Sequence, residues 1–395
     1  MQLKKTLVKL FIGLIVFFLS GLIIKAEQIN DQSIIDEQKI MNYSINLLDW
    51  QSIEALEDQL QAATPKIERF DLKEQVTALM KGETKLTLEG VIGQIGKLFL
   101  GEIGLFIQLG ARFILIVLLC NLLQTLSSSF ESKDTVKIGF FVCYMAILLS
   151  VIQSFSAMIQ LAQTTIDQVL QVMYICIPTL LAFMTTTGYA ASAAAMAPVI
   201  ISALSLVTYI IKVIILPCIV SVVVLEVISA MSETFKVDKF VSLFYKGLKW
   251  ALCGVLLLAV SMLGMYRMTL PYVDLTVKKA TLKFSTAFIP IVGDAVEGAV
   301  DFLMNCSGLI KNTFSAGVII WLLVIVSLPL IKIFSYVLVY HVAGAVIEPI
   351  GDKNMAGIAT KLGKGCEFIM SAVGIVALLG VCCLVICMSV GVQMA

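Results

Sequence analysis

Charged residues are scarce in this chain. They make up 14% of its 395 residues, whereas soluble proteins average about 25%. Hydrophobic residues reach 59%, and a soluble protein has no use for that much apolar surface because it must cover itself with polar side chains. The shortage of charge therefore excludes an ordinary soluble domain and predicts an integral membrane protein.

Catalytic and cofactor-binding signatures are also missing. The chain has a single histidine, His341, so a Ser/His/Asp or Cys/His system has one candidate base. No HExxH, GxSxG, GxxxxGK[ST] or GxGxxG motif marks a catalytic or nucleotide site. We expect no enzyme and no cofactor, and an energy-driven role would need an ATPase in another subunit.

The sequence also lacks the patterns that are typical of metal sites and nucleic-acid-binding sites. The ten cysteines lie in or beside apolar runs, and none belongs to a CxxC pair, so neither zinc nor a disulfide framework is indicated. The net charge of +1 comes with no concentrated basic surface. We expect free cysteines that pack as small hydrophobes, no metal and no nucleic-acid partner.

The N-terminal residues 1–26 have the pattern of a signal peptide or signal anchor. Lys4, Lys5 and Lys9 precede an apolar run over residues 10–24, and Ala26 offers an imperfect cleavage position. Since the positive end of such a segment stays in the cytoplasm, the residues that follow are expected to be exported.

Residues 27–100 form the predicted exported segment. Residues 27–97 hold 13 acidic and 7 basic side chains, which makes this part acidic. Ile53, Leu56 and Leu60 mark one face of a helix. Asp71 and Glu74 have the spacing of a capping box, which indicates a second helix start. We expect a short helical segment here.

Residues 101–395 are predicted to form a polytopic transmembrane domain, which makes the chain all-α. About 20 apolar residues cross a bilayer, and such runs give seven to nine spans after the signal. The candidate runs are residues 103–126, 138–161, 169–187, 189–211, 213–231, 250–266 and 368–392, with one or two spans in 314–350. Lysine-rich loops at 127–137, 232–249 and 351–366 are expected to be cytoplasmic.

Three charged residues inside this apolar region allow two interpretations each. Glu226, Lys212 and Lys332 lie within or between the predicted spans. Charges at bilayer depth are costly and often functional, but lysines near span ends also extend to the membrane surface. We favour the second interpretation for both lysines and leave Glu226 open.

An acidic stripe gives the domain its most distinctive pattern. Asp294, Glu297 and Asp301 are spaced i, i+3, i+7, which places all three on one face of a helix. Pro290 and Gly293 precede them and could bend the chain into the membrane. The helix either lines a water-filled passage or lies on the membrane surface, and we favour the surface.

A set of residues in this region resembles the stage III sporulation protein AE family of endospore-forming bacteria. The residues that carry the resemblance are Ser232-Glu233, Lys236-Val237, Lys283-Phe284, residues 288–293, Asp301, Lys311-Asn312, Pro329, Lys332, Tyr340 and residues 349–351. The order of signal, acidic segment and polytopic domain is similar as well. None of these residues forms a catalytic motif.

The resemblance implies a subunit of the complex that joins the mother cell to the forespore during engulfment. Its location would be the mother-cell membrane around the forespore. Its partners would be membrane lipid, other stage III proteins including a separate ATPase and ring-forming subunits, and a forespore protein across the intermembrane space. A self-contained secondary transporter and a structural membrane scaffold are the alternative functions.

Overall fold

Helices account for all the regular structure that the computed structural model describes. The described residues are 50–63, 72–80, 133–231, 237–288, 293–349 and 353–390, with isolated positions between 104 and 122. They all belong to one unit, Ile45–Ala395, and contain no strand. The predicted all-helical class is thus confirmed for this part of the chain, while the signal at residues 1–26 lies outside it.

The described helices fall into two groups along the chain. Two short helices, α3 (Trp50–Ala63) and α4 (Leu72–Met80), lie in the acidic segment. The others are α6 (Lys133–Thr186), α7 (Ala190–Ile210), the π-helical turn η1 (Ile211–Ile215), α8 (Leu216–Met231), α9 (Asp238–Phe288), α10 (Gly293–Ile347) and α11 (Lys353–Ser389).

The long helices exceed the thickness of a bilayer. Helices α6, α9 and α10 have 54, 51 and 55 residues, which corresponds to about 80 Å each at 1.5 Å per residue. A bilayer core is about 30 Å thick. Among the described residues, five segments are long and apolar enough to cross it: Met145–Thr186, Ala190–Ser229, Lys239–Met265, Ser307–Ile347 and Gly357–Ser389.

Several predicted span boundaries are wrong, because they fall inside continuous helices. Residues 138–161 and 169–187 belong to one helix, α6. The polar stretch between them contains no glycine or proline, and its apolar members Ala162 and Ile166 are fully buried. Hydropathy drops there because one face of the helix is polar, and the helix itself does not end.

The predicted break at Lys212 is also absent, and of the alternatives of one or two spans in 314–350 the structure has one continuous helix up to Ile347. Residues 190–231 run through α7, η1 and α8 without a turn, and Pro329 lies inside α10. A proline clashes with the carbonyl four residues earlier, and for Pro217 that carbonyl belongs to Val213 in η1. The wider π-helical turn accommodates the clash, so the helix continues.

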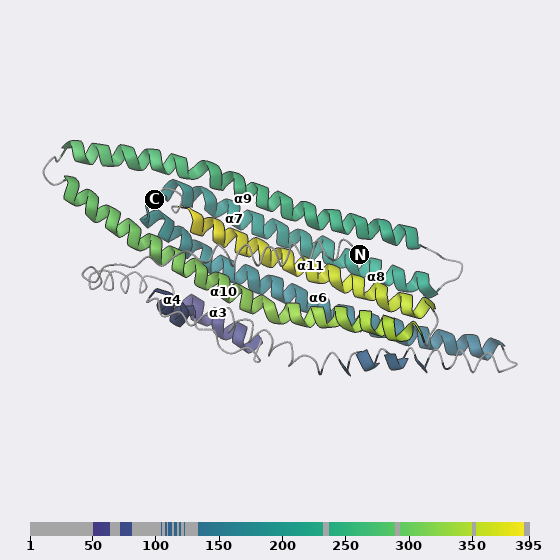
Figure 1. Ribbon diagram of the computed structural model, residues 1–395. Helices are drawn as coiled ribbons and strands as arrows, with labels where there is room; N and C mark the ends of the chain where they lie inside the picture. The colour runs from purple at the N-terminus through teal and green to yellow at the C-terminus, as the bar shows by residue number, and fades with distance from the viewer. Residues whose placement is uncertain are drawn as a thin grey trace. The chain divides into compact units, whose positions relative to one another are not determined.

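Helix α11 holds the bundle together. It contacts α6, α7, α8, α9 and α10, and its pairing with α10 is the most extensive in the bundle (Figure 1). Gly365 makes this packing close: a Cβ there would meet Val223 of α8 and, at 3.0 Å, the ring of Phe155 in α6. Small residues allow such close approach between helices.

Lysine-bearing helix starts gather at one end of the bundle. Helices α6, α9 and α11 begin with Lys133, Lys239 and Lys353 in their first two residues. Figure 1 shows these three starts at the same end, together with the ends of α8 and α10. This is the arrangement that a cytoplasmic location of all three lysine loops requires.

The close contact at Gly365 yields a test of the packing. Gly365→Ala is expected to lower stability by about 1–3 kcal/mol, because the new methyl group overpacks the site. Gly374→Ala is the matched control on α11, since nothing lies within 4 Å of a Cβ there. The measurement is the thermal unfolding midpoint of the detergent-solubilised protein, and an equal shift for both variants would contradict this packing.

Candidate functional site

A charged pair joins α6 and η1 inside two candidate membrane spans. Lys212 Nζ donates hydrogen bonds to both carboxylate oxygens of Asp167, at 2.6 and 2.8 Å. The Lys212 and Asp167 side chains are 28% and 49% exposed. Pairing offsets part of the cost of placing charge at bilayer depth. Lys212 is therefore a paired residue in mid-helix, which corrects its interpretation as a lysine at a span end.

A second polar link lies farther along the same two helices. The Tyr174 and Ser205 hydroxyl oxygens are 2.9 Å apart. Tyr174 follows Asp167 by seven residues and Ser205 precedes Lys212 by seven, so both links lie on the same side of the α6–α7 pair. The two contacts define a polar seam: Asp167, Tyr174, Ser205 and Lys212.

Glu226 and Lys332 occupy different environments. Glu226 on α8 is 6% exposed, and it accepts a hydrogen bond of 2.8 Å from the Tyr245 hydroxyl on α9. The Tyr245 ring in turn stacks on Phe368 of α11. Glu226 thus ties three helices together through Tyr245. Lys332 lies half-buried inside α10, so it too is not at a helix end.

His341 of α10 packs against Gly363 of α11. Its Nδ1 lies 2.8 Å from the Val337 carbonyl oxygen of its own helix, and its Nε2 lies 3.5 Å from Glu367 Oε1. The ring occupies the space that a Cβ at Gly363 would need. These contacts give the single histidine a packing role.

Two charged side chains bind backbone groups that helix ends leave without a partner in their own helix. The Asp274 carboxylate on α9 accepts hydrogen bonds from the Ala191 and Ser192 amides, both at 2.9 Å, and so caps the start of α7. Burial and the neighbouring Asp274 carboxylate raise the pKa of Tyr189. At the end of α11, the buried Lys311 Nζ donates to the Val390 carbonyl.

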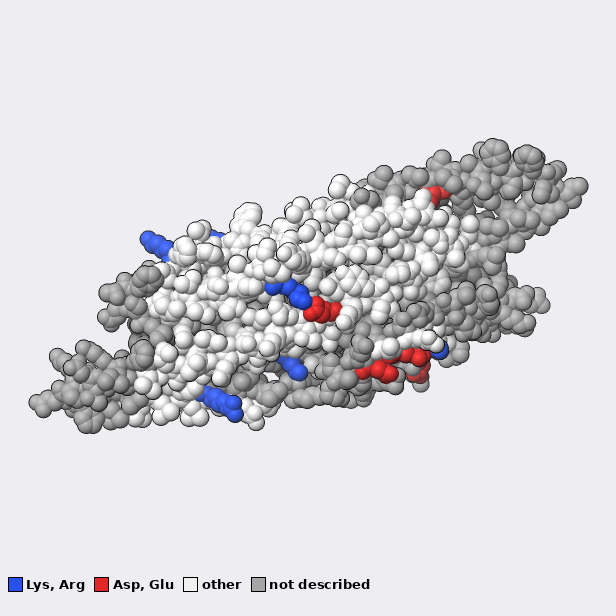
Figure 2. Space-filling view, turned by 180° about the vertical axis from the view of Figure 1, so that it is seen from behind, with Lys and Arg blue, Asp and Glu red and all other residues white. Residues whose placement is uncertain are grey.

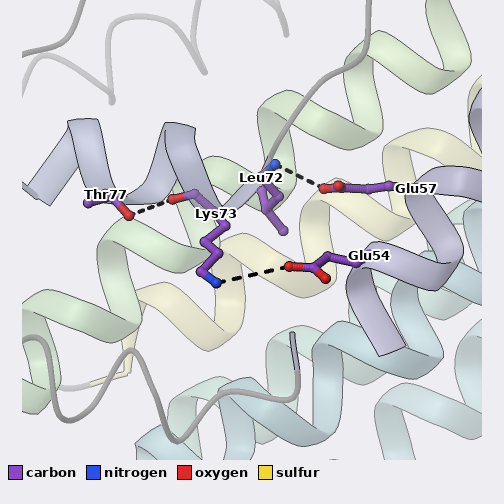
Figure 3. Close-up of polar contacts among 5 residues, drawn as sticks. All are labelled: Glu54, Glu57, Leu72, Lys73 and Thr77. Atoms are coloured by element: carbon purple, nitrogen blue, oxygen red, sulfur yellow. Dashed lines mark hydrogen bonds and ion pairs between the residues drawn. The ribbon is translucent and has the colours of Figure 1, made fainter. Parts of the chain in front are cut away.

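Helices α3 and α4 form a small hairpin that packs on α10. The Glu57 carboxylate, 5% exposed, accepts a 2.9 Å hydrogen bond from the Leu72 amide at the start of α4. Lys73 lies 4.0 Å from Glu54, as Figure 3 shows. The start of α4 directly after Asp71 agrees with the predicted capping box, but Glu57 supplies the cap that the structure describes.

The hairpin contacts α10 through apolar groups. Leu72 and Val76 cover Gly317, where a Cβ would lie 2.8 Å from Val76 and 3.3 Å from Leu72. Trp50 meets Phe314 edge-on, with ring centroids 6.5 Å apart. The acidic segment is therefore anchored to the bundle near the start of the candidate span Ser307–Ile347.

The acidic stripe lies at the start of α10. Asp294, Glu297 and Asp301 fall within its first nine residues, and Gly293 is the first, so one helix carries all three carboxylates. Their side chains and the whole of Pro290 lie outside the described residues. The passage and the membrane surface therefore both stay predictions for this helix. Within the described residues, no group of three His, Cys, Asp or Glu could hold a metal ion.

Comparison with known proteins identifies the family. The family model for stage III sporulation protein AE matches residues 70–391. The chain belongs to the stage III sporulation protein AE family. Stage III sporulation protein AE of Bacillus subtilis (strain 168) is 28% identical over 273 residues, which cover 69% of this chain and 68% of that relative. No solved structure matches the chain significantly.

Sequence reasoning missed two of the acids that the structure brings into polar contacts. Asp167 fell into a presumed loop between two spans, and its partner is 45 residues away. Asp274 caps a helix that begins more than 80 residues earlier in the chain. The sequence offered one clue to Asp167, an acidic residue within an apolar region. The partners of Asp167 and Asp274 cannot be predicted from local residue spacing.

The ion pair makes a prediction about stability. Asp167→Asn is expected to destabilise the protein by about 1–2 kcal/mol, because Lys212 loses its counter-charge in a partly exposed position. Tyr174→Phe, which removes only a neutral contact, should cost about 0.5–1.5 kcal/mol. Exchanging the charges (Asp167→Lys with Lys212→Asp) should restore most of the loss. Unfolding in detergent is the measurement, and a swap no better than Asp167→Asn would contradict the pairing.

The hairpin cap makes a separate prediction. Glu57→Ala is expected to cost about 0.5–2 kcal/mol of local stability, because the buried amide of Leu72 loses its acceptor. Glu54→Ala is the matched control on the same helix, since its contact with Lys73 is long and about half-exposed and such pairs contribute little. Hydrogen exchange of α4 amides is the readout. Equal exchange rates in the two variants would refute the capping role.

Proposed function

We propose that this protein is a non-enzymatic channel or export-apparatus subunit of the complex that links the mother cell to the forespore. The family match over residues 70–391 is the observation that carries the proposal. Five helices that are long and apolar enough to cross a membrane support it. The paired polar groups on α6 and η1 add a reason to expect more than a simple anchor.

The proposed location is the mother-cell membrane around the forespore, with residues 27–100 outside the mother-cell cytoplasm. The hairpin supports this orientation, since it packs near the start of the candidate span in α10. That start lies away from the lysine-bearing ends of α6, α9 and α11 (Figure 1). An extracytoplasmic hairpin would be placed to meet ring-forming partners and a forespore protein across the intermembrane space.

Energy for transport would come from a separate subunit. The sequence has no phosphate-binding loop, so a partner ATPase is part of the proposal. A self-contained secondary transporter is the second candidate function. The observation that favours it is the Asp167–Lys212 pair inside two candidate spans, because such transporters place charged groups at the middle of the membrane.

The acidic stripe provides a functional test. Replacing Asp294, Glu297 and Asp301 together by alanine is expected to reduce spore yield at least tenfold at an unchanged membrane level, if the stripe contributes to the conduit. The charge-conserving variant Asp294→Glu/Glu297→Asp/Asp301→Glu should keep most of the yield. Full spore yield from the alanine variant would count against a conduit lined by these carboxylates.

Co-purification and liposome uptake experiments distinguish the two candidate functions. The subunit role predicts co-purification with other stage III proteins from sporulating cells and no solute uptake by the protein alone in liposomes. Uptake by the protein alone would instead support the transporter. Membrane insertion without either property would leave the scaffold role.

A further inference from the structure

The outward face of α6 differs from that of an ordinary membrane helix. From residue 153 to the end of α6, no exposed position carries leucine, isoleucine, valine, phenylalanine or methionine. The exposed residues are Gln153, Ser156, Ala157, Gln160, Thr164, Gln171, Tyr174, Pro178, Ala182, Thr185 and Thr186. This face lies within the candidate span Met145–Thr186.

These polar positions form a continuous stripe. Gln153, Gln160, Thr164, Gln171 and Tyr174 follow one another at intervals of seven, four, seven and three residues, which keeps them on one side of a helix. The half-exposed Asp167 carboxylate lies within the same stripe. We call these six residues the α6 stripe, and it shares Asp167 and Tyr174 with the polar seam.

Helix α9 shows the contrasting pattern. Its exposed positions include Trp250, Leu257 and Leu258, which are 79%, 70% and 71% exposed. They lie inside the candidate span Lys239–Met265. That surface suits lipid tails, which are as apolar as leucine. Two helices of one bundle thus present opposite chemistry at their outward faces.

Contact between the α6 stripe and lipid tails is energetically unfavourable. Each glutamine amide has two donor hydrogens and an acceptor oxygen, and polar groups without partners in hydrocarbon cost several kcal/mol. Polar residues of membrane helices therefore face protein or a water-filled cavity. In Figure 2 the described surface shows few charged side chains, drawn blue and red among white uncharged residues.

We propose that the α6 stripe lines the water-filled passage of the assembled complex. The proposal rests on the proposed function, and it names the surface that meets the transported material. Water can satisfy the donors and acceptors of every amide and hydroxyl along the stripe, whereas a partner helix would have to supply a matching polar group at each position. The half-exposed ion pair also retains access to water in this arrangement.

The chemistry of the α6 stripe predicts that this surface does not select by charge sign. Asp167 supplies its only ionised group, and Lys212 neutralises that group. The remaining members offer uncharged hydrogen-bonding groups. The transported class would therefore be hydrated polar solutes of either charge, in contrast to channels that carry rings of like charge.

Cysteine accessibility in the full-length protein tests the proposal. In a variant without native cysteines, Gln160→Cys and Gln171→Cys are compared with Leu257→Cys on the lipid-suited face and with Val172→Cys, which is fully buried. Membranes from sporulating cells are treated, from both sides, with a charged thiosulfonate or a lipid-soluble maleimide. We expect the thiosulfonate to modify the two stripe cysteines at least tenfold faster than Cys at 257 or 172.

Two results would overturn the proposal. Faster reaction of the stripe cysteines with the lipid-soluble reagent than with the charged one would place the stripe in lipid. Protection from both reagents in membranes, with reaction after detergent extraction, would mean that a partner protein covers it. Spore yield and partner binding are measured separately, so a failed labelling result leaves the subunit role standing, and a failed subunit role leaves the labelling result intact.

Discussion

Backbone hydrogen bonding in an apolar environment is the constraint on which the rest of this structure depends. A chain surrounded by lipid and apolar side chains has no water to satisfy its amides and carbonyls, so it stays helical as long as it remains in that environment. Helices of more than 50 residues result. They continue through Pro178, Pro198 and Pro329, and the π-helical turn before Pro217 shows how the strain at one such position is accommodated.

In such long helices, a polar residue indicates which face of the helix is polar and does not mark where the helix ends. In a short span a charged residue marks an end, but Asp167 and Lys212 lie in the middle of continuous helices and pair there. Other charges inside long helices bind backbone groups at the ends of neighbouring helices, as Asp274 of α9 and Lys311 of α10 do. The same chemical groups therefore serve two purposes, and the group that the neighbouring helix presents decides which one applies.

The packing of the bundle links these faces to a membrane function. Helix α11 contacts all the other long helices, and glycines at 363 and 365 let its neighbours approach. With the centre filled in this way, the polar stripe of α6 is directed outward and the apolar surface of α9 is left for lipid. A bundle with two unlike outer surfaces suits a subunit that meets lipid on one side and a passage or partners on another.

The sequence by itself determined the helical class, the membrane character, the acidic segment with two helices, and the family. These features follow from composition, from periodicity over a few turns and from residues such as 288–293, all of which are local or additive. Only the tertiary structure decided that residues 162–168 and Lys212 continue helices, because hydropathy averages over all faces of a helix whereas burial acts on each face. It alone paired Asp167 with Lys212 and Asp274 with the start of α7, because those partners lie 45 and more than 80 residues apart and are brought together by packing.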